Sequence, residues 1–378
     1  MDKPLCAIVA DQPRSGERNP GLDGLRGLAA LSVAAGHCVL HVGGLPLWGT
    51  SLRDFPGMSA AEIVMRMLSA VAPSDVAVVV FFVLSGHVLW SSFQRKGLRF
   101  FADGPDYACA RVYRLFPLAI ISGVLLGFLA NASARELTMN MLLLSHSLNG
   151  VLWSLQVEVV ASLALFALWG ITRGTGWKLL LALVLVLGAT PLSRGNPYVV
   201  FLPAFILGAS VSVMPARLLR RGWVVTAAVG VLLLTNVVLG HGGITRCFEI
   251  ASAAVLVGAV ARGRLGFLRS GVPLFLGAIS YPFYLTHWIG LTGANWLMGF
   301  ATWESPFVRV FVLVVLSVGL TIPVAWLLHV GVENPVLRGR PRIKPWRGGS
   351  DLFASDPVSG SPPRLRAAVP RGSAGRAL

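Results

Sequence analysis

The chain of 378 residues is 55% apolar and 13% charged, which is about half the charged fraction of a usual soluble domain. Its mean hydropathy of +0.71 excludes a disordered, collagen-like or disulfide-stapled secreted protein. The net charge of +16 would suggest a nucleic-acid partner in a soluble protein, but here the basic residues are spread between long apolar runs. The composition therefore indicates an integral membrane protein.

Long segments without charged residues predict helices that cross a membrane. No Asp, Glu, Lys or Arg occurs in 27–52, 76–94, 115–134, 195–216, 222–245, 270–303 or 310–332, and a spanning helix needs about 20 mostly apolar residues. The sequence predicts an all-α, polytopic bundle of about ten transmembrane helices. We place them at 22–42, 73–93, 115–131, 150–170, 177–190, 197–214, 223–240, 247–261, 272–293 and 307–329.

The basic residues indicate how these helices are oriented. With the N-terminus in the cytoplasm, the inner loops and tails contain 25 of the 32 Lys and Arg residues, and the outer loops contain 5. Basic residues favour the cytoplasmic side in short loops. An even number of helices returns the chain to the side where it began, so we expect both termini in the cytoplasm.

Two polar segments flank the apolar region. Residues 1–21 are too long and too mixed in charge for the head of a cleavable signal peptide, so they predict a cytoplasmic N-terminal segment. Residues 22–337 form the predicted membrane domain. Residues 338–378, rich in Pro, Gly, Ser and Arg, predict a disordered basic cytoplasmic tail beside anionic lipid headgroups. The spacing of the four cysteines predicts neither a disulfide nor a metal site.

An arginine and a histidine lie on one face of the first predicted helix. Arg26 and His37 are 11 residues apart, close to three helical turns, or about 16 Å along the axis. Ionisable groups inside a membrane are costly and usually functional. A structural alternative remains open, in which Asp23 caps the helix and pairs with Arg26 while His37 binds a neighbouring carbonyl.

Further ionisable residues lie in or beside later helices. Arg111 and Arg114 share one helix face before the third predicted helix and are suited to binding phosphate, although any inner surface is rich in arginine. Glu158 falls within the fourth helix, where an unpaired carboxylate would be costly. His287 falls within the ninth helix, and Glu333 follows the last one, where we expect it to cap the helix or bind an inner loop.

Six motifs, taken together, resemble the acyltransferase 3 family of integral-membrane O-acyltransferases. They are LDGLRG with a downstream GH, FFVLSG, an Arg-x-x-Arg before Leu-x-Pro, WSLxxE, SYPFYLTH and a final Glu-x-Pro, and they occur in family order over residues 20–337. The resemblance implies transfer of an acyl group from cytoplasmic acyl-CoA to a hydroxyl, usually on a sugar of a surface or secreted glycan. It also links the three arginines named above to acyl-CoA.

The resemblance assigns an essential role to His37. A sugar hydroxyl is a poor nucleophile, and an imidazole, which titrates near neutral pH, is suited to removing its proton during attack on the thioester. Glu158 or Asp23 would orient or charge-balance the imidazole, and an acyl-His intermediate is an open alternative. The sequence departs from the family pattern at His87, often an aromatic residue in relatives, and at Ala110, often an arginine.

The same motifs contain Ser154, Tyr284 and His287, which we expect to support the catalytic residues. No permanently bound cofactor and no metal is expected. The expected co-substrate is acyl-CoA, most simply acetyl-CoA, for O-acetylation. The expected partners are a glycan (a polysaccharide or a lipid-linked saccharide) and membrane lipids, with no nucleic acid.

Two other functions fit parts of the pattern. One is a transporter or flippase in which His37, Glu158 and His287 relay protons, and the other is an acyltransferase for a small molecule such as a macrolide. Counted along the predicted helices, these three residues lie roughly 8–12 Å below the outer boundary, whereas the arginines lie near the inner one. We therefore expect the donor to enter from the cytoplasm and the acceptor to be met in the outer half of a bacterial cytoplasmic membrane.

Overall fold

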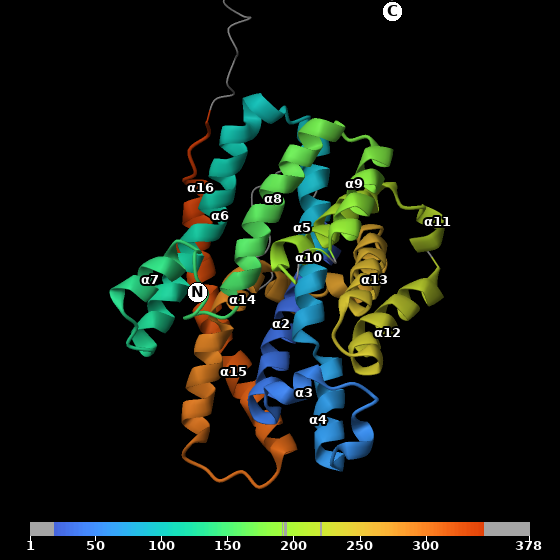
Figure 1. Ribbon diagram of the computed structural model, residues 1–378. Helices are drawn as coiled ribbons and strands as arrows, with labels where there is room; N and C mark the ends of the chain where they lie inside the picture. The colour runs from blue at the N-terminus through green and yellow to red at the C-terminus, as the bar shows by residue number, and fades with distance from the viewer. Residues whose placement is uncertain (1–18, 191, 193–194, 220, 344–378) are drawn as a thin grey trace, which may run out of the picture.

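The predicted all-α class is confirmed. The computed structural model describes residues 19–190, 192, 195–219 and 221–343, and within these residues every regular element is a helix (Figure 1). The α-helices are α2 (Pro20–Gly43), α3 (Leu45–Gly49), α4 (Ala60–Val71), α5 (Ser74–Lys96), α6 (Phe100–Leu129), α7 (Ala134–Met141), α8 (Leu152–Thr172), α9 (Gly176–Ala189), α10 (Pro197–Ser210), α11 (Ala216–Leu219), α12 (Gly222–Leu239), α13 (Gly243–Ala261), α14 (Gly271–Met298), α15 (Pro306–Leu328) and α16 (Asn334–Arg338). Short 3₁₀ turns lie at Phe55–Gly57, Val211–Val213 and Gly266–Arg269, and one π-helical turn at His329–Glu333.

Each of the ten predicted helices falls on a separate helix of the structure. Seven described helical segments are long and apolar enough to cross a membrane, which makes this a multi-pass membrane protein. They are Pro20–Gly43, Ala60–Lys96, Phe100–Leu129, Leu152–Thr172, Gly222–Leu239, Gly243–Ala261 and Pro306–Arg338. The apolar helices Gly176–Ala189 and Pro197–Val213 are shorter.

The third helix differs most from its predicted bounds. The sequence places its start at residue 115, because charged residues precede that point, but α6 begins at Phe100. Two of those charges are paired: Arg340 donates to Asp106 from Nη1 at 3.0 Å and from Nη2 at 3.3 Å, and Arg111 binds a carboxylate described below. The Arg340 contact also fastens the start of the predicted tail to α6. Residues 1–18 and 344–378, which make up most of the predicted end segments, lie outside the described residues.

Helix α2 lies in the middle of the bundle and packs against α5, α14 and α15 (Figure 1). Its contact with α14 is made through backbone atoms. A β-carbon on Gly27 would lie 2.4 Å from the Gly277 nitrogen, and one on Gly277 would lie 2.2 Å from the Asp23 carbonyl oxygen. Small residues permit such close approach of membrane helices. The glycines therefore fix α2 and α14 relative to each other, and with them the side chains that these helices carry.

Gly277→Ala is expected to prevent correct packing of the bundle. The added methyl group would collide with main-chain atoms of Asp23, which cannot rotate away as a side chain can, and overpacking of this kind costs about 1–3 kcal/mol or more. The measurement is the yield and thermal stability of detergent-extracted protein. Gly271→Ala, in the first turn of the same helix, meets no described atom within 4 Å and serves as the control.

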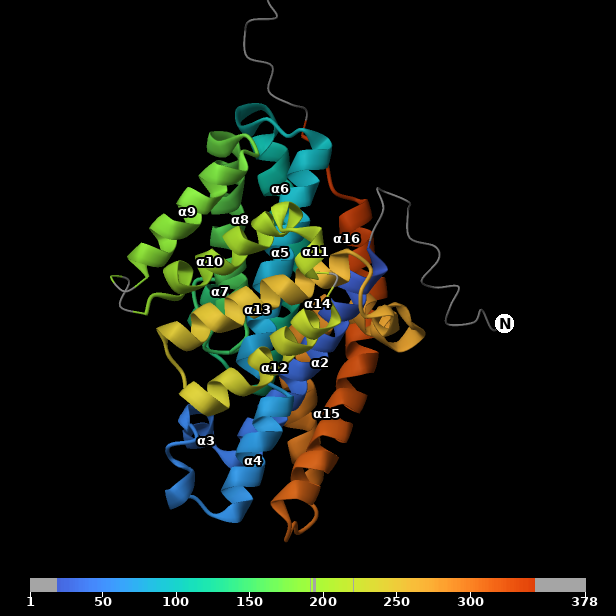
Figure 2. The ribbon, with the colours of Figure 1, turned by 90° about the vertical axis from the view of Figure 1, so that its right-hand side faces the viewer.

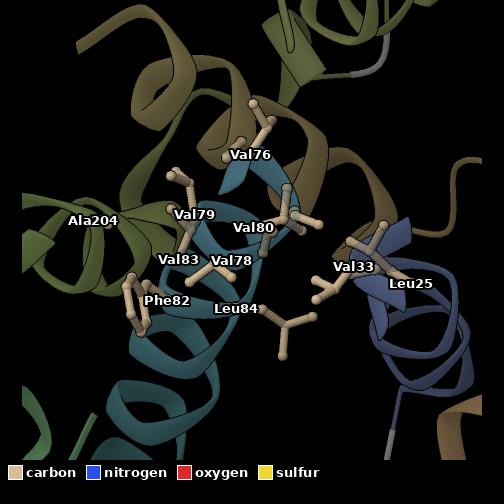
Figure 3. Close-up of a cluster of buried hydrophobic side chains, with 14 of the residues drawn as sticks. Leu25, Val33, Val76, Val78, Val79, Val80, Phe82, Val83, Leu84 and Ala204 are labelled. Carbon is tan, nitrogen blue, oxygen red and sulfur yellow. The ribbon is translucent and has the colours of Figure 1, made fainter. Parts of the chain in front are cut away.

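A valine-rich face of α5 forms the main core between α2 and α10. Figure 3 shows Val76, Val79 and Val83 of α5 between Leu25 and Val33 of α2 and Ala204 of α10. β-Branched side chains have few rotamers, so they pack densely at little entropic cost. Helices α12 and α13 pack against each other, and α13 covers α5 from outside (Figure 2).

Candidate active site

His37 of α2 and His287 of α14 form a hydrogen-bonded pair of imidazoles. His37 Nδ1 lies 2.8 Å from His287 Nε2, and the two rings are nearly coplanar, with 7° between their planes and 5.0 Å between their centroids. These values describe an in-plane hydrogen bond rather than stacked rings. His287 is fully buried and His37 is half-buried. The structure thus joins two histidines that the sequence singled out separately.

The hydrogen bonds of the pair define the tautomer of each neutral ring. His287 Nδ1 lies 2.7 Å from the Tyr284 carbonyl oxygen, which can only accept, so this nitrogen carries the proton. His287 Nε2 is then the acceptor, and His37 Nδ1 donates to it. The lone pair of His37 Nε2 remains unshared, because no described residue hydrogen-bonds to that atom. The pair therefore presents one basic nitrogen.

Three side chains surround the histidine pair. The Trp288 indole packs across both imidazoles, with its centroid 5.1 Å from that of His37 and 5.9 Å from that of His287. The hydroxyl oxygens of Ser154 and Tyr284 lie 2.7 Å apart. This bond joins α8 to α14 one turn before His287, so Ser154 and Tyr284 lie where supporting residues were predicted.

Glu158 of α8 binds Arg111 of α6 rather than His37. Its Oε1 lies 2.8 Å from Arg111 Nη2, and the two side chains are 24% and 9% exposed. Asp23, the other acid proposed to orient His37, lies 3.7 Å from Arg26. The orienting partner of His37 in the structure is therefore His287, and both acids instead pair with arginines.

The Arg111–Glu158 pair corrects the expected depths. The sequence placed Arg111 near the inner boundary and Glu158 in the outer half, but direct contact puts them at one level. Because α6 begins at Phe100, Arg111 lies about three turns, or about 16 Å, along that helix. Arg26 and Arg114 also act electrostatically on Glu158. Arg111 therefore binds this carboxylate directly, whereas Arg26 and Arg114 add only longer-range positive charge.

Arg114 is the arginine best placed to receive a ligand. It is exposed, and it forms no hydrogen bond or ion pair within the described part of the chain. The Tyr281 hydroxyl donates to the Leu115 carbonyl, which holds α14 to α6 beside it. Guanidinium groups bind phosphate with two parallel donors. Of the three predicted acyl-CoA residues, Arg111 and Arg26 form ion pairs with carboxylates, whereas Arg114 forms none with the described residues.

Arg111→Ala and Arg114→Ala are expected to have different effects. Removing Arg111 leaves Glu158 without its ion-pair partner, and breaking a buried pair costs about 3–5 kcal/mol, an upper bound here because Glu158 is 24% exposed. We expect lower thermal stability and lower yield. Removing the exposed Arg114 should leave stability unchanged and raise the KM for acyl-CoA.

A double variant tests whether the stability lost in Arg111→Ala comes from the unpaired Glu158 carboxylate. Arg111→Met with Glu158→Leu removes both charges, and a well-packed apolar pair often restores the stability of a buried ion pair. Full stability of Arg111→Ala alone, measured by thermal unfolding, would contradict the structural role. An unchanged KM for acyl-CoA in Arg114→Ala would leave that residue an ordinary basic residue of the inner surface.

A buried polar network, not singled out from the sequence, joins α5 to α12 and α13. Asp75 Oδ2 accepts from Asn236 and His241 at 3.2 Å each and lies 3.5 Å from Arg246. Arg246 also lies 2.6 Å from Glu249, which is fully buried. Glu249 lies inside a predicted span, so the rule that selected the acid of the fourth helix would also have found it.

A second pair not singled out as such lies at the end of α15. His329 Nδ1 lies 2.7 Å from Glu333 Oε2, across a single π-helical turn. Glu333 was expected to cap the last helix or to bind an inner loop, and instead it binds a side chain of its own turn. Within the described ranges, no three His, Cys, Asp or Glu side chains are grouped to hold a metal ion.

A cavity of about 430 Å³ lies beside the N-terminal end of α8. It is lined by Trp153, Gln156, Pro197, Tyr198 and residues 143–146, which include a serine and an exposed histidine. Its lining combines two aromatic rings with amide, hydroxyl and imidazole groups. Trp153 directly precedes Ser154, so one turn of α8 adjoins the cavity and also contacts Tyr284 of α14.

The candidate site lies within the part of the chain that matches a known protein family. Residues 19–329 match the family described as an acyltransferase domain. The acyltransferase MdmB of Streptomyces mycarofaciens is 26% identical over 92% of this chain and 98% of its own length. No solved structure matches. The matched region begins just before α2 and ends at His329, so it contains both members of the histidine pair.

Proposed function

Because the chain belongs to the acyltransferase 3 family, we propose that it transfers an acyl group, most simply acetyl, from acyl-CoA to a hydroxyl of a surface or exported glycan. The observation that carries this proposal is the histidine pair, since it leaves His37 Nε2 as a base beside a buried, oriented partner. A general base at the attacking hydroxyl is the group that this reaction needs.

In the proposed reaction, the acceptor hydroxyl donates a hydrogen bond to His37 Nε2. Its oxygen attacks the thioester carbonyl while the proton moves to Nε2, and His287 Nε2 continues to accept from Nδ1 of the imidazolium. The carbon–sulfur bond then breaks, and the proton passes to the CoA sulfur. The products are the acyl ester and free CoA, so no charge is left on the protein.

The proposed path of the donor begins at Arg114 of α6 and Arg26 of α2 and continues along α2. Arg114 and Arg26 would bind the CoA phosphates on the cytoplasmic side, and the acyl end would extend toward His37, about 16 Å from Arg26 along the helix. Ten spanning helices, cytoplasmic termini and a bacterial cytoplasmic membrane belong to the same proposal. The acceptor would approach from the outer side, and the aromatic and polar lining of the cavity beside α8 suits a saccharide.

The test combines a cellular and a purified assay. Mass spectrometry of surface glycans should show O-acyl groups in cells with the gene and none in cells without it. Purified protein supplied with glycan from cells without the gene as the acceptor should release CoA thiol from acetyl-CoA and form the acyl ester. Turnover that acylates an added macrolide, with unchanged surface glycans, would assign a small-molecule acceptor, and no turnover of any acyl-CoA with either acceptor would refute the acyltransferase proposal.

A further inference from the structure

The indole N–H of Trp288 is a buried donor beside the proposed base, and it has no hydrogen-bond partner among the described residues. Native proteins satisfy nearly all buried polar groups, and a buried donor without an acceptor is destabilising. Two other tryptophans of this chain follow the rule. Trp169 donates to the Leu98 carbonyl at 2.8 Å, and Trp303 donates to the Met298 carbonyl at 3.0 Å.

The position of the Trp288 ring connects this donor to the reaction. The ring lies against His37 and His287, with its centroid 5.1 Å from that of His37, so this donor belongs to a side chain packed on the proposed base. Its Nε1 edge faces Gly150, an exposed residue of the α7–α8 loop, where a β-carbon would lie 3.8 Å from Nε1. Glycine at position 150 therefore places no side chain beside this donor.

We propose that the Trp288 indole N–H is a catalytic hydrogen-bond donor for the thioester oxygen, an inference that rests on the proposed function. When the acceptor hydroxyl loses its proton to His37 and attacks the carbonyl carbon, the carbonyl π electrons move to oxygen. That oxyanion accepts from Nε1–H until the carbon–sulfur bond breaks and the carbonyl re-forms. The thiolate then takes the proton from His37.

The chemistry of the indole suits this role. Its N–H stays protonated throughout the physiological pH range, and it can donate but not accept. A fixed donor in a water-poor site stabilises developing charge more strongly than a donor exposed to water. The same donor contributes little to the binding of the neutral thioester, so its loss should appear in kcat rather than in KM.

The test removes the N–H while keeping the ring. Trp288 is replaced by phenylalanine and, separately, by 3-benzothienylalanine, in which sulfur takes the place of the N–H in a ring of nearly the same shape. Purified full-length protein is assayed with acetyl-CoA and the glycan acceptor for release of CoA thiol, and its thermal stability is recorded. We expect kcat to fall about 100-fold, the loss seen for one oxyanion donor, with an unchanged KM for acetyl-CoA. Trp296→Phe, on the same helix and 66% exposed, should have wild-type kinetics.

The outcomes distinguish this inference from the function on which it rests. A benzothienyl variant with wild-type kcat, or with a raised KM and an unchanged kcat, overturns the donor role. Wild-type protein that releases no CoA from any acyl-CoA refutes the proposed function itself. A folded benzothienyl variant with reduced kcat supports the inference even if Trp288→Phe fails to fold.

Discussion

His37→Ala is expected to lower acyl transfer by between about 10²- and 10⁴-fold, the usual contribution of a general base. The substitution removes the one unshared nitrogen lone pair of the histidine pair. His287 Nε2 keeps a lone pair in this variant, but it lies at the place of the hydrogen bond to His37 Nδ1, one imidazole ring away from the place of His37 Nε2, so it should not reach the acceptor hydroxyl. The protein should still fold, since one neutral hydrogen bond contributes about 0.5–1.5 kcal/mol and alanine favours a helix.

The control for this variant lies one turn further along α2. His41 is exposed, and its Nε2 lies 3.1 Å from Asn295 Oδ1 of the same neighbouring helix. His41→Ala therefore also removes one imidazole and one contact with α14, but it should retain full acyl transfer. Both are measured as CoA release in the presence of the glycan acceptor, by purified protein of verified thermal stability. Substantial transfer by a folded His37→Ala protein would exclude the general-base role.

The helices were largely predictable because the membrane demands long apolar segments. Ten apolar runs predicted ten separate helices, and the 11-residue spacing on the first of them was correctly interpreted as one face. Two short amphipathic helices were missed, although their signal is local. Ser59 with Glu62 at the start of α4, and Ser133 with Glu136 at the start of α7, form capping boxes that the sequence shows directly.

The pairing of ionisable side chains could not be predicted from one sequence. Arg111 and Glu158 are 47 residues apart, and His37 and His287 are 250 apart. Hydropathy indicates which residues enter the membrane, but not which of them meet. Charged residues before residue 115 therefore appeared to end a helix, whereas the fold neutralises them by contacts with α8 and the chain after α16.

The positions of the glycines indicate where helices approach each other closely, which the number of glycines alone does not. Gly27 and Gly277 permit backbone contact between α2 and α14, and this contact sets the distance between His37 and His287. A buried donor without an acceptor, such as the Trp288 N–H, cannot be predicted from a sequence pattern, because it depends on which atoms surround it in the folded protein. The sequence therefore singled out His37 and His287 separately, and only the fold shows that they meet.

His287→Phe is expected to lower acyl transfer by about 10²-fold. This loss is smaller than the roughly 10⁴-fold loss when a catalytic triad loses its carboxylate partner, because His287 is neutral and orients His37 without balancing its charge. Without an acceptor at Nδ1, His37 can take the other tautomer, in which Nε2 carries the proton and is no longer a base. The KM for acyl-CoA should not change.

His287→Gln distinguishes orientation from proton transfer by His287 itself. The Gln side-chain oxygen can reach the place of His287 Nε2 and accept from His37 Nδ1, so this variant should recover most of the activity that phenylalanine loses. Asparagine offers the same amide but is too short to reach, and it should remain impaired. Equal inactivity of folded Gln and Phe variants would mean that the second imidazole must exchange a proton. The pair would then act as a two-histidine relay, and His37 would not be the final carrier of the acceptor proton.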